Sequence, residues 1–180
     1  RTKVMLNHKF SAKSKLTLGY FNDQLFYDLN LGVFWDENNA YQTVLDKSGN
    51  TSMNRAFVNW KYKMSKDLTV TSGLHYTYFG LNGSQALEPR LGVKWNVTPR
   101  QSVNFGAGLH SKTETLSAYF AEEVDENGVS HKLNEDMGLT RSSHFVLGYN
   151  AQVSNNLKVG AEFYYQYLYI TLKNKECVPV

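Results

Sequence analysis

Three histidines offer the first chemistry that this sequence could perform. His75, His110 and His144 each stand in a segment whose side chains alternate between apolar and polar, and each stands on the polar side. Imidazole nitrogens bind zinc and other transition metals, so a shared metal or ligand site is one interpretation. We favour the other, a polar lining that hydrogen-bonds to its neighbours, because no carboxylate stands at a matching height. The sequence therefore predicts no metal site and no cofactor.

Motifs of catalysis are missing from the sequence. It contains no nucleotide-binding glycine fingerprint, no nucleophile elbow and no HExxH pair. Asp136 with His110 and His144 would suit a small hydrolase of the Ser–His–Asp kind, which is the weaker interpretation. We expect no catalytic residues and no enzyme. The net charge of +3, with bases scattered among acids, also argues against a nucleic-acid partner.

Charged side chains share the polar side of the alternating segments with the histidines. We expect all of them to face the lumen of a barrel. Besides His75, His110 and His144, the predicted lumen-facing residues are Arg55, Lys61, Lys63, Glu88, Arg90, Lys94, Lys158 and Glu162. Such a basic wall could attract anions or an acidic protein surface, and mutual salt bridging is an equally good interpretation.

Aromatic side chains gather in two long links that we expect near residues 22–54 and 112–142. Rings in such links can stack on a bound small molecule. The predicted ligand-binding residues are Trp35, Tyr41, Tyr119 and Phe120, with Phe34 beside them. Packing of the links against themselves is the competing interpretation.

The elements that position these residues follow from period-two alternation, which places successive side chains on opposite faces of a β-strand. Val159 and Phe163 fall on one face, for example, and Glu162 on the other. The sequence has no run of eighteen apolar residues, so a transmembrane helix is excluded. A barrel remains possible, because only every second residue of its strands meets lipid.

Short and long connections alternate along the chain. Tight polar turns are expected at 11–13, 65–67, 98–100 and 154–155. The links near 22–54 and 112–142 are long, and this asymmetry is typical of outer-membrane barrels, whose long loops lie outside the cell. Trp and Tyr residues near both strand ends, such as Trp95 and Tyr165, fit two aromatic girdles at the membrane surfaces.

We therefore predict an all-β fold, either an antiparallel up-and-down transmembrane β-barrel or a contiguous segment of roughly eight strands of a larger one. Residues 1–170 would form the barrel segment, and residues 171–180 a C-terminal tail of uncertain structure. Pro89 removes a ladder hydrogen bond, so an edge, a bulge or a strand end is expected there. A soluble β-sandwich or lipocalin-like barrel, with its apolar face inward, is the competing fold.

Four segments resemble a known family in their residues as well as in their period. They are Ala86–Trp95 (ALEPRLGVKW), Phe105–Ser111 (FGAGLHS), Ser143–Tyr149 (SHFVLGY) and Glu162–Tyr169 (EFYYQYLY). These segments resemble the barrel of TonB-dependent outer-membrane receptors, particularly those of the Bacteroidetes type.

The resemblance implies a bacterial outer-membrane location and the import of a nutrient. In that family a barrel in outer-membrane lipid encloses a plug domain, and the inner-membrane TonB complex powers uptake of a siderophore, cobalamin or an oligosaccharide. The chain would be a piece of the barrel wall, with the plug and TonB as partners through segments outside it. The alternative is a complete eight-stranded barrel acting as an adhesin, an anchor or a lipid-modifying enzyme. That alternative requires the strand near residue 3 to pair with the strand near residue 165.

Overall fold

Long β-strands dominate the structure, a computed structural model that describes residues 1–35, 40–124, 130–132 and 134–169. At 33, 35, 40–42, 44, 123–124 and 130–132 the structure describes the backbone alone. The elements are β1 (Thr2–Lys9), β2 (Ser14–Trp35), β3 (Ala40–Lys63), β4 (Leu68–Phe79), β5 (Ser84–Thr98), β6 (Gln101–Lys112), α1 (Leu116–Tyr119), β7 (Glu122–Val124), β8 (Ser130–Lys132), β9 (Thr140–Gln152) and β10 (Lys158–Tyr169). The predicted tail, 171–180, lies outside the described residues.

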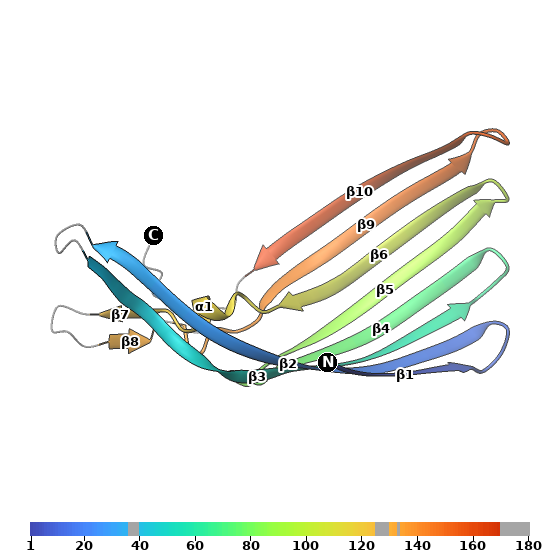
Figure 1. Ribbon diagram of the computed structural model, residues 1–180. Coiled ribbons are helices and arrows are strands. Elements are labelled where there is room, and N and C mark those ends of the chain that lie inside the picture. The colour runs from blue at the N-terminus through green and yellow to red at the C-terminus, as the bar shows by residue number, and fades with distance from the viewer. Residues whose placement is uncertain (36–39, 125–129, 133, 170–180) are drawn as a thin grey trace.

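One 8-stranded sheet contains all the long strands, in the order β1-β2-β3-β4-β5-β6-β9-β10. Each strand pairs antiparallel with the next, so the predicted all-β, up-and-down fold is confirmed. β1 and β10 lie at opposite edges of the sheet (Figure 1). In the described part of the chain they pair only with β2 and β9, so the sheet is an open segment and not a closed eight-stranded barrel.

Short turns close one end of the sheet, on the right in Figure 1. All four predicted turns begin with a hydroxyl that accepts a hydrogen bond from the backbone N–H two residues further on, at 3.1 to 3.3 Å. The hydroxyls belong to Ser11, Ser65, Thr98 and Ser154. They satisfy backbone donors that the strand ladder leaves open at a tight turn.

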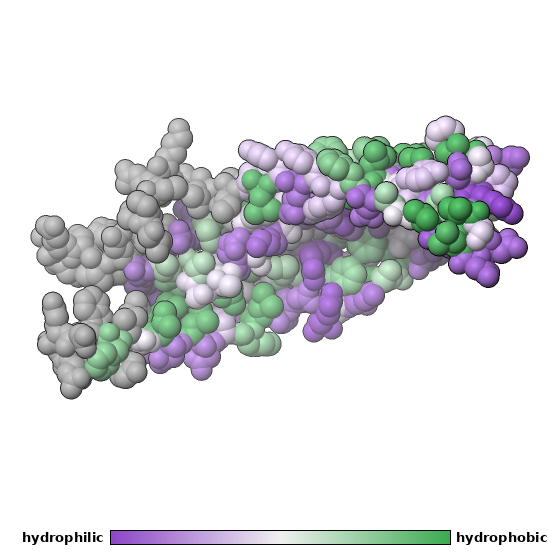
Figure 2. Space-filling model, turned by 90° about the horizontal axis from the view of Figure 1, so that it is seen from above, coloured by the Kyte–Doolittle hydropathy of each residue, from purple (hydrophilic) through white to green (hydrophobic). Residues whose placement is uncertain are grey.

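The sheet has one polar face, as the alternation predicts. The register aligns His75 with Glu88. Arg90, two positions after Glu88, aligns with Gly108, and Gly108 aligns with His144. The side chains of His75, Glu88, Arg90 and His144 therefore point to the same side. The same register places on that side every residue predicted to face a lumen, namely Arg55, Lys61, Lys63, His75, Glu88, Arg90, Lys94, His110, His144, Lys158 and Glu162. A hollow runs between the two edges of the curved sheet when it is seen from above (Figure 2).

The opposite face is apolar and exposed. Leu147 is 52% exposed and pairs with Phe163, which is 67% exposed. Phe105, on the other side of Leu147, is 40% exposed. A continuous apolar surface of this kind marks contact with a membrane or with another protein.

Two strands continue where a long loop was expected, so the predicted link at 22–54 is wrong. β2 and β3 stay paired from Asn22 and Asn54 up to Trp35 and Ala40. They extend well beyond the other strands (Figure 1). The alternation continues through this stretch but changes sides, since Leu25, Leu29 and Leu31 now fall on the polar face, and only Phe26 keeps to the outer face before the bulge at Leu31 and Gly32. Apolar residues on the outer face, which predict the other strands, are therefore scarce here.

The buried core lies at the loop end of the sheet. It contains Phe79 from β4, Ala86 from β5, Tyr119 from α1, and Met137 and Leu139 from the segment before β9. The predicted long link after β6 is thus a packed cap on the polar face, and it includes α1 and the β7–β8 hairpin. No helix among the described residues is long and apolar enough to cross a membrane.

Candidate binding surface on the polar face of the sheet

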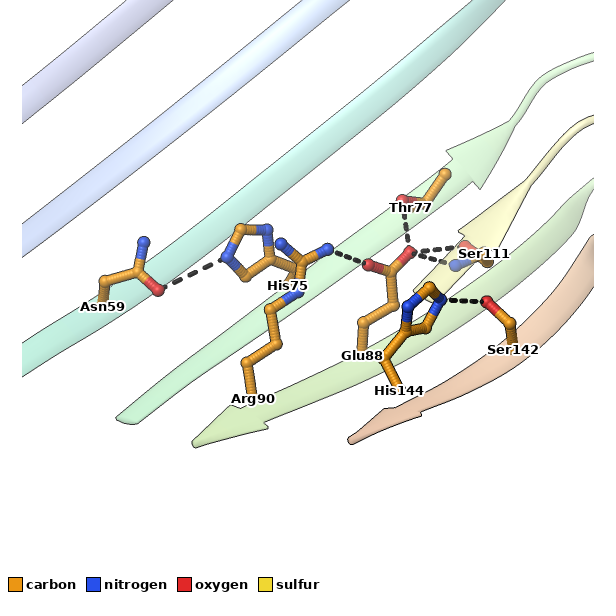
Figure 3. Close-up of polar contacts among 8 residues, drawn as sticks. All are labelled: Asn59, His75, Thr77, Glu88, Arg90, Ser111, Ser142 and His144. Carbon is orange, nitrogen blue, oxygen red and sulfur yellow. Dashed lines mark hydrogen bonds and ion pairs between the residues drawn. The ribbon is translucent and has the colours of Figure 1, made fainter. Parts of the chain in front are cut away.

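Glu88 organises the polar face where β4, β5 and β6 meet (Figure 3). It is only 4% exposed. Its carboxylate accepts hydrogen bonds from the Arg90 guanidinium at 2.7 Å and from the Thr77 hydroxyl at 3.4 Å. The Ser111 backbone N–H donates to it at 3.2 Å, and the Ser111 hydroxyl donates to the same oxygen. A buried carboxylate is tolerated here because donors surround it.

Pro89 explains why Glu88 occupies this place. The β4–β5 ladder runs through Pro89, but the β5–β6 ladder begins only at Arg90, which pairs with Gly108. Proline has no N–H to donate, and from Pro89 toward the loop end the two strands part. The Glu88 carboxylate takes the Ser111 N–H that a neighbouring strand would otherwise pair. The strand edge expected at Pro89 is confirmed.

His75 belongs to a column of stacked rings on the same face. The His75 and Phe57 ring centroids are 5.1 Å apart, and those of Phe57 and Phe21 are 5.8 Å apart. The His75 Nε2 atom lies 3.3 Å from the side-chain oxygen of Asn59 (Figure 3). Gly19 makes room for the column, because a Cβ atom at this position would collide with the Phe57 ring.

Three arginines line a cavity beside these rings. Its volume is about 390 Å³, and Arg1, Arg55, Arg90 and Phe21 contribute to its walls. Arg1 and Arg55 both form ion pairs with Asp23, and their guanidinium carbons lie 5.3 and 5.8 Å from the centre of the Phe21 ring. The buried Nε atoms of Arg55 and Arg90 have no hydrogen-bond partner among the described residues. Asp23 and Glu88 pair with the three arginines, which leaves one positive charge in excess, and the remaining guanidinium donors suit an anionic ligand.

His110 and His144 form the second histidine group, with ring centroids 4.4 Å apart. Both nitrogens of His144 have partners, since the Ser142 hydroxyl lies 2.7 Å from Nε2 and the Tyr164 hydroxyl contacts Nδ1. The third member beside Ser142 and His144 is thus a phenol and not the carboxylate of Asp136. No group of three or more His, Cys, Asp or Glu side chains in the described ranges could hold a metal ion.

The other predicted lumen residues lie closer to the short turns. They are Lys61, Lys63, Lys94, Lys158 and Glu162, and all of them are exposed. They share a face with Glu88, but none of them joins its hydrogen-bonded cluster or forms an ion pair within the described residues. The structure therefore divides the predicted polar lining into a buried network and an open basic surface.

The predicted ligand-binding aromatic residues differ in their settings. Tyr119 is 2% exposed, packs 5.4 Å from the Phe79 ring centre, and accepts a hydrogen bond from the Glu114 backbone N–H at 3.3 Å. Burial raises the pKa of Tyr119 above its usual value. Contrary to our prediction, its ring packs the cap and has no face open to a ligand.

Phe120 is half-buried, and its ring centre lies 5.1 Å from that of Tyr27 on β2. It therefore ties the cap to the extended hairpin. At the tip of that hairpin, Trp35 pairs with Ala40 and Tyr41 pairs with Phe34 through their backbones. The side chains of Trp35 and Tyr41 lie outside the described part of the structure.

Several residues at the site were not among the predicted ones. They are Arg1, Phe21, Asp23, Phe57, Ser111, Ser142 and Tyr164. Alternation alone would have placed Phe57 and Tyr164 on the polar face. Ser111 has no such signal, because its role depends on the parting of β5 and β6.

The fold of this chain is similar to part of a solved receptor structure. A crystal structure of a mutant ferric enterobactin receptor from Pseudomonas aeruginosa matches 90% of this chain, with a TM-score of 0.66 and 16% sequence identity. The chain has the fold of a receptor's barrel wall. It spans 25% of the length of that receptor chain. The resemblance to a TonB-dependent receptor barrel is thus confirmed at the level of the fold, while no family model and no curated protein matches the sequence.

Proposed function

We propose that the chain forms part of the barrel wall of a TonB-dependent outer-membrane receptor that imports a nutrient. The apolar face contacts outer-membrane lipid, and the polar face lines the lumen that a plug domain occupies. The cap and the long β2–β3 hairpin project from the cell. The chain serves transport and not catalysis, and the TonB complex acts through segments outside it.

The two faces of the sheet carry this proposal. Leu147 and Phe163 are largely exposed on one face, while the other face holds the charged and hydrogen-bonded residues. A soluble β-sandwich would bury the apolar face against a second sheet. The described residues contain only the two-stranded β7–β8 sheet besides the main one, and the cap lies on the polar face. Lipid is the environment that satisfies this arrangement.

The open edges favour a piece of a large receptor over a complete small barrel. Unpaired backbone groups along β1 and β10 would be costly in hydrocarbon, because lipid offers no hydrogen-bond partner. Further strands must therefore pair with both edges. The fold match supports the same conclusion, since the chain covers 25% of a much longer receptor.

An anionic nutrient suits the arginine-lined cavity. Arg1, Arg55 and Arg90 surround it, and Phe21 and Phe57 supply aromatic surface. Among the nutrients implied for the family, a ferric siderophore complex with negative charge fits this chemistry best, and one similar solved structure is a ferric enterobactin receptor. Ferric enterobactin and cobalamin binding to the full-length protein can be compared by tryptophan fluorescence quenching. Tighter binding of cobalamin would contradict this nutrient class.

Spin labels on single cysteines test the proposed orientation of the wall. Labels replacing Leu147 and Phe163 should be accessible to a lipid-soluble quencher in vesicles of the full-length protein. Labels replacing Asn150 and Glu162, which lie on the polar face of neighbouring strands, should be accessible to a water-soluble quencher. The reverse pattern would show a soluble barrel with its apolar side inside.

A further inference from the structure

A single charged residue stands on the outer face of β4, β5, β6, β9 and β10, five strands that the structure describes in full. The register places every other Asp, Glu, Lys and Arg of these strands on the polar face. The exception is Arg141 of β9, which is exposed and forms no ion pair within the described residues. A charge on an apolar surface is costly unless a neighbouring group meets it. An anion outside the sheet would satisfy Arg141.

Arg141 lies near the loop end of the outer face. It stands opposite Ser111 on β6 and Tyr169 on β10. Its guanidinium donates to the Gln85 carbonyl of β5 at 3.3 Å, so the side chain reaches over the gap where β5 and β6 part. Tyrosine prefers the headgroup level of a membrane, which places Arg141 at that level. Arginine has five N–H donors, so donors remain for a second acceptor.

An apolar groove begins beside Arg141 and follows β6 away from the loop end. Its volume is about 300 Å³, and its walls include Pro89, Leu91, Ala107, Leu109, Ser143 and Phe145. Ala107 pairs with Leu91 on one side and with Phe145 on the other. Leu91 and Phe145 are exposed, whereas Ala107 is half-buried between them. One small residue between two large ones therefore forms the floor of the groove.

The width of the groove suits a single hydrocarbon chain. Its walls belong to β5 and β9, which lie on either side of β6 and are thus about 10 Å apart between backbones. An α-helix is itself about 10–12 Å in diameter and would not fit between the wall side chains. Ser143 lines the groove two residues from Arg141, a distance of about 7 Å along the strand. A chain in the groove would therefore bring its headgroup to the Arg141 guanidinium.

We propose that this groove and Arg141 form a binding site for one lipid of the outer leaflet that carries a phosphorylated headgroup. An acyl chain lies over Ala107 between Leu91 and Phe145, and a phosphate accepts hydrogen bonds from Arg141. The guanidinium fork matches the geometry of phosphate. The inference rests on the proposed function, because only then does the loop end of the outer face lie in the outer leaflet.

Native mass spectrometry of the full-length protein, purified in detergent and stripped of lipid, tests the inference. The probes are lipid A, a phosphorylated glycolipid, and the same lipid A after enzymatic removal of its phosphates. We expect lipid A to bind about tenfold more tightly, which corresponds to one charge-assisted hydrogen bond. Arg141→Gln should abolish this preference, whereas Arg100→Gln, an equal change of charge in a short turn, should keep it. Equal binding of the two probes, or an unchanged preference in Arg141→Gln, would overturn the inference.

A matched pair of variants tests the acyl chain separately. Ala107→Phe places a ring in the groove, and Ala161→Phe places the same ring on the outer face of β10, away from the groove. Both positions face lipid, so both variants should fold and keep the heat-dependent gel mobility of a barrel. Ala107→Phe should weaken the binding of both probes about tenfold, by steric exclusion, and Ala161→Phe should weaken neither. Equal affinities of the two folded variants would overturn the inference.

Failure of this inference can be told apart from failure of the proposed function. The lipid-soluble quencher at position 147 reports on contact with lipid in general. Lipid contact there, together with equal binding of the two probes, would refute the lipid site and leave the barrel wall intact. Loss of lipid contact would refute the proposed function, and with it the leaflet that the lipid site requires.

Discussion

Replacing Glu88 tests whether the buried network holds β5 and β6 together where their ladder ends. Glu88→Ala removes the acceptor of the Ser111 N–H and the counter-charge of Arg90. A buried donor left unsatisfied costs about 1–3 kcal/mol, and a broken buried ion pair about 3–5 kcal/mol. Because the Arg90 side chain is 35% exposed, solvent screens part of the second loss. We expect the free energy of unfolding to fall by about 2–4 kcal/mol in total.

Two further variants separate charge from hydrogen bonding in this network. Glu88→Gln keeps an oxygen for Ser111 and loses the charge-assisted bond with Arg90, so we expect a fall of about 1–2 kcal/mol. Glu162→Gln is the matched control, since this acid is exposed on the same face and forms no ion pair within the described residues. It should change stability by less than about 0.5 kcal/mol.

Urea unfolding of the full-length protein in lipid vesicles, followed by tryptophan fluorescence, gives the free energy of unfolding of each of the three variants. The expected order of destabilisation is Glu88→Ala, then Glu88→Gln, then Glu162→Gln. In the double variant Glu88→Gln/Arg90→Gln, the loss should be smaller than the sum of the two single losses, because the two residues interact directly. If both Glu88 variants match Glu162→Gln, the network does not stabilise the wall and our reasoning is refuted.

Three other predictions concern the outer face, a glycine and the cap. Leu147→Arg, on the exposed apolar face, should lower stability in a bilayer by about 2–4 kcal/mol, whereas Val146→Arg on the polar face should cost much less; equal losses in the same urea assay would count against a lipid-facing surface. Gly19→Ala should cost about 1–3 kcal/mol, because its Cβ would collide with a ring of β3, while Gly106→Ala should cost less than 1 kcal/mol; similar unfolding midpoints would refute the steric role of Gly19. Tyr119→Ala should loosen the cap by about 3–5 kcal/mol of lost packing and speed its cleavage in limited proteolysis, and an unchanged cleavage rate would show that Tyr119 does not hold the cap.

Alternation and turn residues made most of the sheet predictable. The polar turns at Ser11, Ser65 and Ser154 follow from hydroxyls that bond to backbone two residues away, which is a local property of the sequence. The face of each strand follows from a period of two, which is also local. For the same reason all eleven predicted lumen residues lie on one face.

The extended hairpin and the cap were harder to predict, because their apolar residues face the other way. Leu25 and Met53 continue the alternation of β2 and β3 but pack against the core of the cap, on the polar side of the sheet. Tyr119 was expected to bind a ligand, and its burial depends on Phe79, which is far away in the sequence. Long-range packing of this kind leaves no periodic signal around the residue itself.

The sequence by itself determined the short turns, the strands outside the extended hairpin and the cap, and the side of the sheet on which their residues lie, since all three depend on neighbours within a few positions. Only the tertiary structure decided which of those residues meet. Glu88 reaches Ser111, and Lys15 stands opposite Lys61, because of strand register. Register is set by hydrogen bonds between strands that are distant in the chain, and a shift of one residue would send every side chain of a strand to the opposite face.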